Sequence, residues 1–307
     1  MAVIKMNFLS QALGMQTNIT ICLPTYSFAD AVADRREVYV PGMKYQVLWL
    51  LHGGSGDDSD YLNFSNIARY ADENKIAVVM PAGYDSFYTN WHEGCDGAQY
   101  YTYITEELFH TLPILFPFST KREDNFVAGL SMGSHGAMKI AINHPERYAA
   151  ALIMSGSAIR PKNIAQGLDT VAEHSGPLPT ILKRITRLQQ EDFVKGTEND
   201  VNAIAVEKAR SGQPLSQFFI TCGGDDFALE GTKYGSDYLK ELGYNVYFEE
   251  IPGYVHEWDF WDLALRKALK EWLPRLPERK IKLVHMSEIV KVLNPQLKAS
   301  FEESQGE

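Results

Sequence analysis

The feature that most constrains this chain is a short apolar run that leads directly into a G-x-S-x-G motif. The apolar run covers residues 126–130, the motif covers 129–133 with Ser131 at its centre, and a helical pattern follows. A serine in this setting occupies a sharp strand-to-helix turn, and glycines flank it because neighbouring backbones pass close by. The pattern therefore predicts a nucleophile elbow at Ser131. The alternative is an ordinary small-residue turn between a strand and a helix.

The rest of the chain repeats the alternation of strand and helix in which such a turn occurs. Apolar runs, most of them followed by turn residues and a helical pattern, cover residues 45–51, 76–80, 125–130, 148–154, 217–221 and 245–250. Before them, residues 6–13 and 15–23 flank Gly14 and alternate polar with apolar side chains, which predicts an antiparallel hairpin at the sheet edge. We therefore expect an α/β fold with a mostly parallel, twisted sheet and helices on both faces.

The strand pattern stops between residues 157 and 214, where helices are predicted around 179–188 and 200–211. We interpret about 158–214 as a helical cap insertion over the carboxyl edge of the sheet, where ligands bind in open α/β sheets. The alternative is an excursion that does not contact the site. Apolar residues at helical spacing over 257–273 predict a closing helix. These patterns predict one α/β domain at 1–275 and a charged C-terminal extension at 276–307, with a short amphipathic helix at 288–293.

Charge and cysteine content narrow the classes of partner. The 307 residues carry 29 Lys and Arg against 39 Asp and Glu, a formal net charge of −10, which disfavours binding to nucleic acids or anionic membranes. We find neither a signal-peptide pattern at the beginning nor an apolar run of membrane-spanning length, and we expect a cytoplasmic protein. Cys22, Cys95 and Cys222 are widely spaced, which predicts reduced, buried thiols rather than disulfides or a zinc site.

A serine hydroxyl becomes a good nucleophile only when a base takes its proton, and a carboxylate usually orients that base. In α/β-hydrolases the chain order is serine, then acid, then histidine. Three histidines lie beyond the elbow's helix and the turn after it. His174 falls in the cap and His285 among the lysines of the tail, whereas His256 follows the strand at 245–250 and precedes the closing helix. His256 is therefore the predicted general base.

Two aspartates are candidates for the carboxylate. The strand at 217–221 ends in the sequence Cys-Gly-Gly-Asp-Asp-Phe, which places Asp225 and Asp226 on a tight loop at the carboxyl edge of the sheet. Either could orient His256, and their spacing does not separate them. Each could instead cap the helical pattern at 229–242.

The tetrahedral intermediate of acyl transfer requires N–H donors near its oxyanion. The strand at 45–51 runs into the glycine-rich sequence at 52–57, which in this architecture supplies one donor, and the residue after the nucleophile supplies the other. We predict the N–H groups of Gly54 and Met132. A phosphate-binding loop is the alternative, but no Gly-Lys-Ser/Thr follows. His52 has no second ligand at metal spacing, and no dinucleotide fingerprint is present, so we expect no metal and no cofactor.

Five segments in register carry a resemblance to a known family. They are residues 50–57, 81–83 leading to 87–91, 129–133, 222–227 and 256–258. With them the chain resembles the esterase D family, and within it the bacterial tributyrin esterases, over about residues 1–275. These are α/β-hydrolases that act on short-chain acyl esters, and their relatives include S-formylglutathione hydrolases, acetyl-xylan esterases and feruloyl esterases.

The resemblance also bears on individual residues. It implies that the aspartate just before the loop's aromatic residue is catalytic, which favours Asp226. It implies that Tyr88 and Trp91 border the substrate pocket, although burial in the core accounts equally well for these aromatic residues. Gly53 and Trp258 are further candidates for the pocket. The chain departs from many relatives after the second elbow glycine, where it has Ser134 and His135.

Together these observations predict a serine carboxylesterase that hydrolyses small acyl esters through an acyl-enzyme. Ser131, Asp226 and His256 are the predicted catalytic triad, and Gly54 and Met132 the predicted oxyanion hole. The alternatives are an S-formylglutathione hydrolase, an acetyl-xylan or feruloyl esterase acting on oligosaccharides, and an inactive binding module. The sequence leaves open the physiological ester, the acyl length and the leaving group. A homo-oligomer is compatible with its edge strands.

Overall fold

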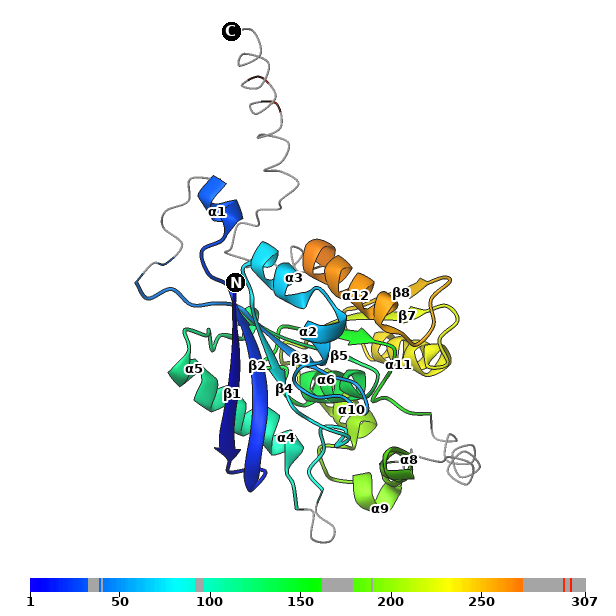
Figure 1. Ribbon diagram of the computed structural model, residues 1–307. Helices are drawn as coiled ribbons and strands as arrows, with labels where there is room; N and C mark the ends of the chain where they lie inside the picture. Colours follow the sequence, from blue (N-terminus) through cyan, green and yellow to red (C-terminus); the bar gives the residue numbers. More distant parts are fainter. Residues whose placement is uncertain are drawn as a thin grey trace.

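The computed structural model describes residues 1–32, 39, 41–91, 97–161, 179–188, 190–272, 295 and 299. Its centre is an eight-stranded sheet with the strand order β1-β2-β4-β3-β5-β6-β7-β8 (Figure 1). The strands are β1 (Ala2–Ser10), β2 (Met15–Leu23), β3 (Val47–Leu51), β4 (Ala77–Pro81), β5 (Asn125–Leu130), β6 (Ala150–Met154), β7 (Gln217–Gly223) and β8 (Val246–Ile251). The predicted mostly parallel sheet is confirmed.

The hairpin β1–β2 forms one edge of this sheet. β1 is antiparallel to β2, and β2 is antiparallel to β4. All the strands from β3 to β8 run parallel to one another. β1 therefore begins at the edge of the sheet where the parallel strands begin. The expected hairpin is confirmed, but its first strand covers Ala2–Ser10 rather than residues 6–13. It ends earlier because Leu13 turns into the core and Gly14 takes a φ of 67° in the turn.

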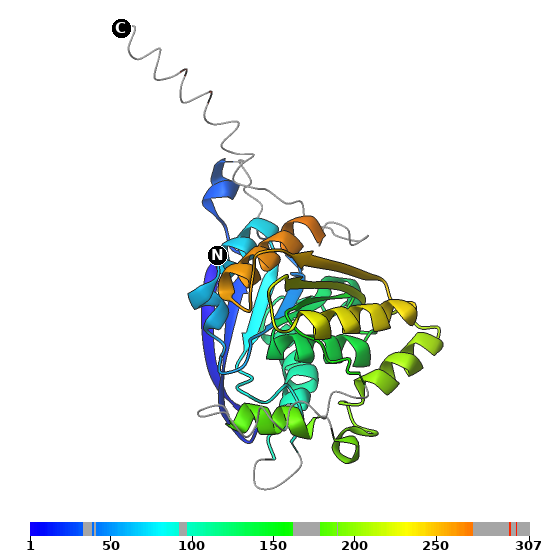
Figure 2. The same ribbon diagram turned by 90° about the vertical axis from the view of Figure 1, so that its right-hand side faces the viewer.

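Helices cover both faces of the sheet (Figure 2). One face carries α2 (Asp60–Phe64), α3 (Ile67–Asn74) and α12 (Trp258–Lys267), which continues as the π-helical turn η3 (Ala268–Trp272). The other carries α4 (Tyr100–Thr102), η1 (Tyr103–Leu108) and α5 (Phe109–Leu115), which form one continuous helix, together with α6 (Met132–Asn143), α10 (Val201–Arg210) and α11 (Leu229–Glu241). The remaining described helices are α1 (Phe28–Val32), η2 (Arg122–Asp124), α8 (Pro179–Arg187) and α9 (Glu191–Val194).

Successive side chains of the central strands enter the two cores in turn. In β3, Val47 and Trp49 belong to the core under α6, whereas Leu48 and Leu50 belong to the core under α3 and α12. Every residue of β3 is buried. Because both faces are covered, the parallel strands appear in the sequence as continuous apolar runs rather than as alternating ones.

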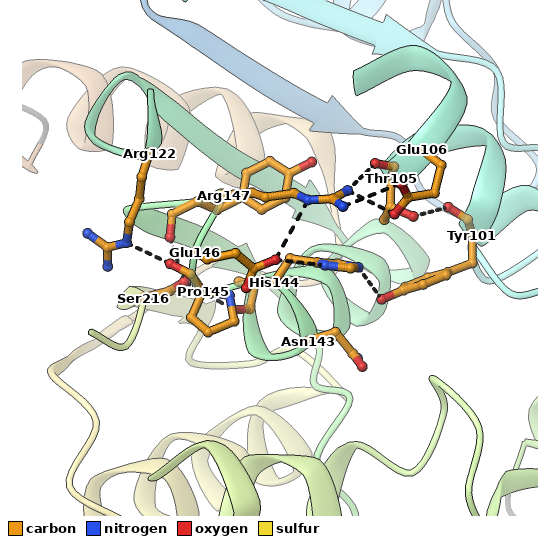
Figure 3. Close-up of polar contacts among 12 residues, drawn as sticks. Tyr101, Thr105, Glu106, Arg122, Asn143, His144, Pro145, Glu146, Arg147 and Ser216 are labelled. Carbon is orange, nitrogen blue, oxygen red and sulfur yellow. Dashed lines mark hydrogen bonds and ion pairs between the residues drawn. The ribbon is translucent and has the colours of Figure 1, made fainter. Parts of the chain in front are cut away.

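A polar network fixes the C-terminal end of α6 to the helix 100–115 (Figure 3). Arg147 donates from its two Nη atoms to the Glu106 carboxylate at 2.9 and 3.3 Å, and it also donates to the carbonyl oxygen of Thr105. The Tyr101 hydroxyl lies 2.8 Å from Nε2 of His144, the residue after α6. Two-point Arg–carboxylate contacts fix orientation as well as distance. The network therefore anchors the helix whose first turn follows Ser131.

The described helices of the expected cap lie against the loop that follows β4 and against α6. The Trp91 ring stacks on Phe193 of α9 at 5.3 Å, and Arg184 of α8 donates to the carbonyl oxygen of Asp85 at 2.7 Å. α10 packs on α6. Residues 162–178 and 189 of the expected cap lie outside the described residues, as do residues 273–307 of the chain's end apart from 295 and 299.

The cysteines and the lengths of the helices bear on two further expectations from the sequence. Cys22 and Cys222 are buried free thiols, and Cys95 lies outside the described residues. Among the helices that the structure describes, none is both long enough and apolar enough to cross a lipid bilayer.

Candidate active site

Ser131 occupies a sharp turn between β5 and α6. Its backbone has φ 51° and ψ −117°, outside the regions that residues with a side chain normally adopt. Such strain persists only where the surrounding structure holds it in place. Here the Ser131 N–H donates to the carbonyl oxygen of Met154 at the end of β6, at 2.9 Å. The strand-to-helix turn expected from the sequence is therefore present.

The two glycines of the motif permit three backbones to approach one another. A Cβ atom on Gly129 would lie 2.1 Å from the carbonyl oxygen of Gly133, and one on Gly133 would lie 2.1 Å from the carbonyl oxygen of Leu51. Both contacts are with backbone, which cannot rotate away. The glycines therefore let the end of β3 pass directly beside the turn.

His256 follows β8 and reaches the serine. Its Nε2 lies 2.9 Å from Oγ of Ser131, and its Nδ1 lies 3.0 Å from each carboxylate oxygen of Asp226. An ionised carboxylate only accepts hydrogen bonds, so Nδ1 carries the ring proton and Nε2 is left to accept the serine proton. The structure thus joins three residues that lie far apart in the sequence.

The structure also distinguishes the two aspartates. The Asp226 side chain has no exposed surface, and its Oδ1 accepts a hydrogen bond from the Ala228 N–H at 2.8 Å. Burial by itself would raise the pKa of this carboxyl, but hydrogen bonds from His256, the Ala228 N–H and Ser155 outweigh it and hold the pKa below its usual value. Asp225 is exposed, and its N–H donates to the Tyr254 carbonyl oxygen. Asp226 is the aspartate in contact with the imidazole.

The loop after β3 lies over the serine. A Cβ atom on Gly53 would lie 2.6 Å from Cδ1 of Leu130 and 3.5 Å from Cβ of Ser131, so the loop backbone is in direct contact with the turn. Gly54, the next residue, is exposed. Met132 is the first residue of α6, where N–H groups have no partner within the helix. Both expected oxyanion donors therefore lie on segments that adjoin Ser131.

His52 has a structural role that the sequence did not indicate. Its buried ring accepts a hydrogen bond from the Gly83 N–H at Nε2, at 2.8 Å, and donates from Nδ1 to the Gly53 carbonyl oxygen, at 2.7 Å. The ring therefore links the loop after β3 to the loop after β4. Burial lowers the pKa of His52 and favours the neutral ring that this pattern needs. No cluster of metal-binding side chains occurs in the described ranges.

The aromatic residues proposed for the substrate pocket occupy three different environments. Tyr88 is fully buried, its hydroxyl donates to the His52 carbonyl oxygen, and its ring fills the space beside Gly83. This is the placement expected of a core residue, which was the alternative to a position at the substrate pocket. Trp91 is half-buried against the described cap helices, and Trp258 is half-buried against Tyr61 and Phe64.

Comparison with known proteins identifies the family. The family model Esterase, described as "Putative esterase", matches residues 10–192. An acetyl esterase of Caldicellulosiruptor saccharolyticus is 26% identical over 279 residues, covering 91% of this chain and all of that protein.

Two solved structures from Staphylococcus aureus are also similar to this chain. Fluorophosphonate-binding serine hydrolase F superposes with a TM-score of 0.72 and 30% identity, covering 89% of this chain and 98% of that one. An S-formylglutathione hydrolase superposes with a TM-score of 0.70, 30% identity and the same coverage. The strand order and these likenesses agree on an esterase D-like α/β-hydrolase. The chain therefore belongs to the esterase family and is a serine esterase, a hydrolase of carboxylic esters.

Proposed function

We propose that Ser131, His256 and Asp226 form the catalytic triad of this esterase. The observation that carries the proposal is the unbroken chain of hydrogen bonds from Oγ of Ser131 through the imidazole to the buried carboxylate, at 2.9 and 3.0 Å. The serine at its end is half-buried on a strained strand-to-helix turn, and α/β-hydrolases present their nucleophiles on such turns.

The arrangement suits acyl transfer through a covalent intermediate. Nε2 of His256 takes the hydroxyl proton as Oγ of Ser131 attacks the ester carbonyl carbon, and Asp226 stabilises the imidazolium. The N–H groups of Gly54 and Met132 are proposed to hold the oxyanion. The imidazolium then gives its proton to the departing alcohol, which leaves the acyl group on Ser131. Water, deprotonated by the same imidazole, hydrolyses this acyl-enzyme and restores the serine.

Short-chain acyl esters of small molecules are the proposed substrates. The acetyl esterase relative, which matches over nearly the whole chain, supports a short acyl group. We further propose that residues 158–214 act as a cap insertion that borders the substrate site. The contact of Arg184 with Asp85, on the loop after β4, supports this placement. The net charge of −10 supports neutral small molecules rather than nucleic acids as partners.

Replacement of the nucleophile tests the proposal. Ser131→Ala should lower kcat for p-nitrophenyl acetate by about a thousandfold or more, as removal of a triad member does in other serine hydrolases. Ser211→Ala, which removes a hydroxyl from the exposed end of α10, should retain full activity. A fluorophosphonate probe should add its mass to the wild type and to Ser211→Ala only. Normal turnover by folded Ser131→Ala would show that the mechanism is wrong.

A second candidate substrate class is the thioester S-formylglutathione. The 30% identical staphylococcal S-formylglutathione hydrolase supports it, and the same nucleophile could attack a thioester carbonyl. Initial rates with acetyl, butyryl and S-formyl substrates would decide between the two classes. A kcat/KM for S-formylglutathione far above those for oxygen esters would favour the thioester.

A further inference from the structure

The imidazole of His256 lies between two aromatic rings. The Phe227 ring centroid is 4.3 Å away at an interplanar angle of 36°, and the Trp261 centroid is 4.9 Å away at 90°. Phe227 is 83% exposed, whereas Trp261 is 6% exposed and lies in the first turns of α12. Trp261 is therefore the more rigid of the two aromatic neighbours of the imidazole, because a buried ring has little freedom to move.

Trp261 also makes a directed hydrogen bond. Its Nε1 lies 3.0 Å from Oγ of Ser155. An indole N–H can only donate, so the Ser155 oxygen accepts this bond, which fixes the orientation of the indole ring.

Ser155 is itself held in place. It follows β6 with φ 59°, is 1% exposed, and its N–H donates to the carbonyl oxygen of Thr221 in β7. The oxygen that accepts the indole N–H therefore lies at a fixed point between the strand ends. Ser155 also helps to hold the pKa of the Asp226 carboxyl below its usual value.

We propose that Ser155 and Trp261 are positioning residues of the esterase. The hydrogen bond to Ser155 holds the indole of Trp261, and this ring, which is perpendicular to the imidazole, holds His256 in line with Oγ of Ser131. The inference depends on the proposed triad, since it concerns the geometry from which His256 takes the proton of Ser131.

The expected effect is on the chemical step. An indole that loses its hydrogen bond to Ser155 can turn about its side-chain bonds, and the imidazole packed against it then departs from the line to Oγ of Ser131. Displacements of about 1 Å in reacting groups can cost about a hundredfold in rate. Neither Ser155 nor Trp261 is proposed to touch the substrate, so KM should be unaffected.

Two variants break the connection at different points. Trp261→Phe keeps a ring against His256 and removes the N–H, and Ser155→Ala removes the hydroxyl. Each should lower kcat for p-nitrophenyl acetate by about ten- to a hundredfold with KM unchanged. The double variant should be no slower than the slower single variant, because both changes break one connection. The downfield ¹H NMR signal of the His256 Nδ1 proton should shift in both.

Trp272→Phe is the matched control. Trp272 is 2% exposed, and its Nε1 has no hydrogen-bond partner in the part of the chain that the structure describes. This substitution also removes a buried indole N–H, so it should leave kcat and the imidazole signal as in the wild type. Thermal unfolding of every variant measures the stability lost with packing. If Trp261→Phe does not fold, the kcat of Ser155→Ala alone tests the proposed positioning.

Three outcomes would count against these ideas. Wild-type kcat and an unshifted imidazole signal in Ser155→Ala would overturn the inference. Losses that multiply in the double variant would also overturn it, because they would indicate two independent packing defects. Full turnover by Ser131→Ala would instead overturn the proposed function, whatever the results for Ser155 and Trp261.

Discussion

Two serines at neighbouring strand ends adopt a backbone conformation that serine rarely takes. Ser131 has φ 51° and Ser155 has φ 59°. Each such residue costs on the order of 1–3 kcal/mol. In both, the N–H donates to a carbonyl oxygen of the next strand, Met154 for Ser131 and Thr221 for Ser155. Adjacent strands therefore support both turns, one presenting the proposed nucleophile and the other the oxygen that accepts the indole N–H of Trp261.

Gly133→Ala should damage the turn at Ser131 and destabilise the protein. The new Cβ would lie 2.1 Å from the carbonyl oxygen of Leu51, and the backbones must separate to admit it. We expect a loss of about 1–3 kcal/mol in the free energy of unfolding, measured by urea denaturation, and a large loss of kcat.

Gly231→Ala in α11 is the control for this substitution. A Cβ at this helical position would meet no atom within 4 Å, so alanine should stabilise the protein by about 0.5–1 kcal/mol. Equal stability changes in the two variants would contradict the close-approach explanation.

Individual residues differed in how far the sequence could predict them. The sequence predicted Ser131 from its flanking glycines, which form a local pattern, and His256 from its place in the chain order of serine, acid and histidine. The choice between Asp225 and Asp226 needed the resemblance, and the structure shows that only Asp226 contacts the imidazole. Ser155 and Trp261 lie 106 residues apart, and no local pattern indicates their hydrogen bond.

At the scale of elements, α6 connects the site to the described cap helices through a buried lysine. Lys139 is fully buried, and its Nζ donates to Thr89 at 2.8 Å, to Asn199 at 2.9 Å and to the carbonyl oxygen of Phe87 at 3.2 Å. These partners belong to the loop after β4 and to the segment just before α10. Burial lowers the pKa of Lys139 to about 7.

The shifted pKa of Lys139 predicts a specific dependence of stability on pH. Between pH 7 and pH 9 the unfolded chain keeps this lysine protonated while the folded protein releases the proton, so the free energy of unfolding rises with pH. We expect a rise of about 2 kcal/mol from this group, and its absence in Lys139→Met. Urea denaturation of both proteins at the two pH values measures the difference. Parallel pH profiles would show that the buried amine does not titrate in this range.

Elements were predicted better than their boundaries. The buried parallel strands were recognised because both of their faces are apolar, and α12 because its apolar residues recur at helical spacing. The end of β1 was misplaced by three residues, since Leu13 is apolar but belongs to the turn. The environment of Tyr88 depends on contacts with His52 and Gly136, which are remote in sequence, so the sequence could not decide between a core residue and a pocket residue.

At the scale of the whole molecule, the net charge of −10 should act on charged substrates. Asp57, Asp60 and Asp85 lie near His52 and therefore near the loop that adjoins Ser131. An anionic ester is repelled by this field, and salt screens the repulsion. We expect kcat/KM for p-nitrophenyl hemisuccinate to rise several-fold between about 10 mM and 0.3 M NaCl. The neutral p-nitrophenyl acetate is the control, and an equal response of both would refute a charge effect.

The strand order is a property of the whole molecule that apolar runs do not specify. The sequence pattern predicted a parallel sheet with an edge hairpin, but the position of β4 between β2 and β3 follows from which strands pair after folding. The family resemblance predicted the α/β-hydrolase fold class, whereas the strand order is known only from the structure. The site depends on this order, since Ser131 and Asp226 follow β5 and β7, which flank β6.

The direction of β1 has a practical consequence for handling the enzyme. Its nine residues run from the edge opposite Ser131 towards the edge that holds it, a length of about 30 Å. A tether attached at Ala2 would therefore fasten the molecule by the end remote from its chemistry. Beads or electrodes coupled in this way should leave the proposed nucleophile facing the bulk liquid, open to dissolved esters.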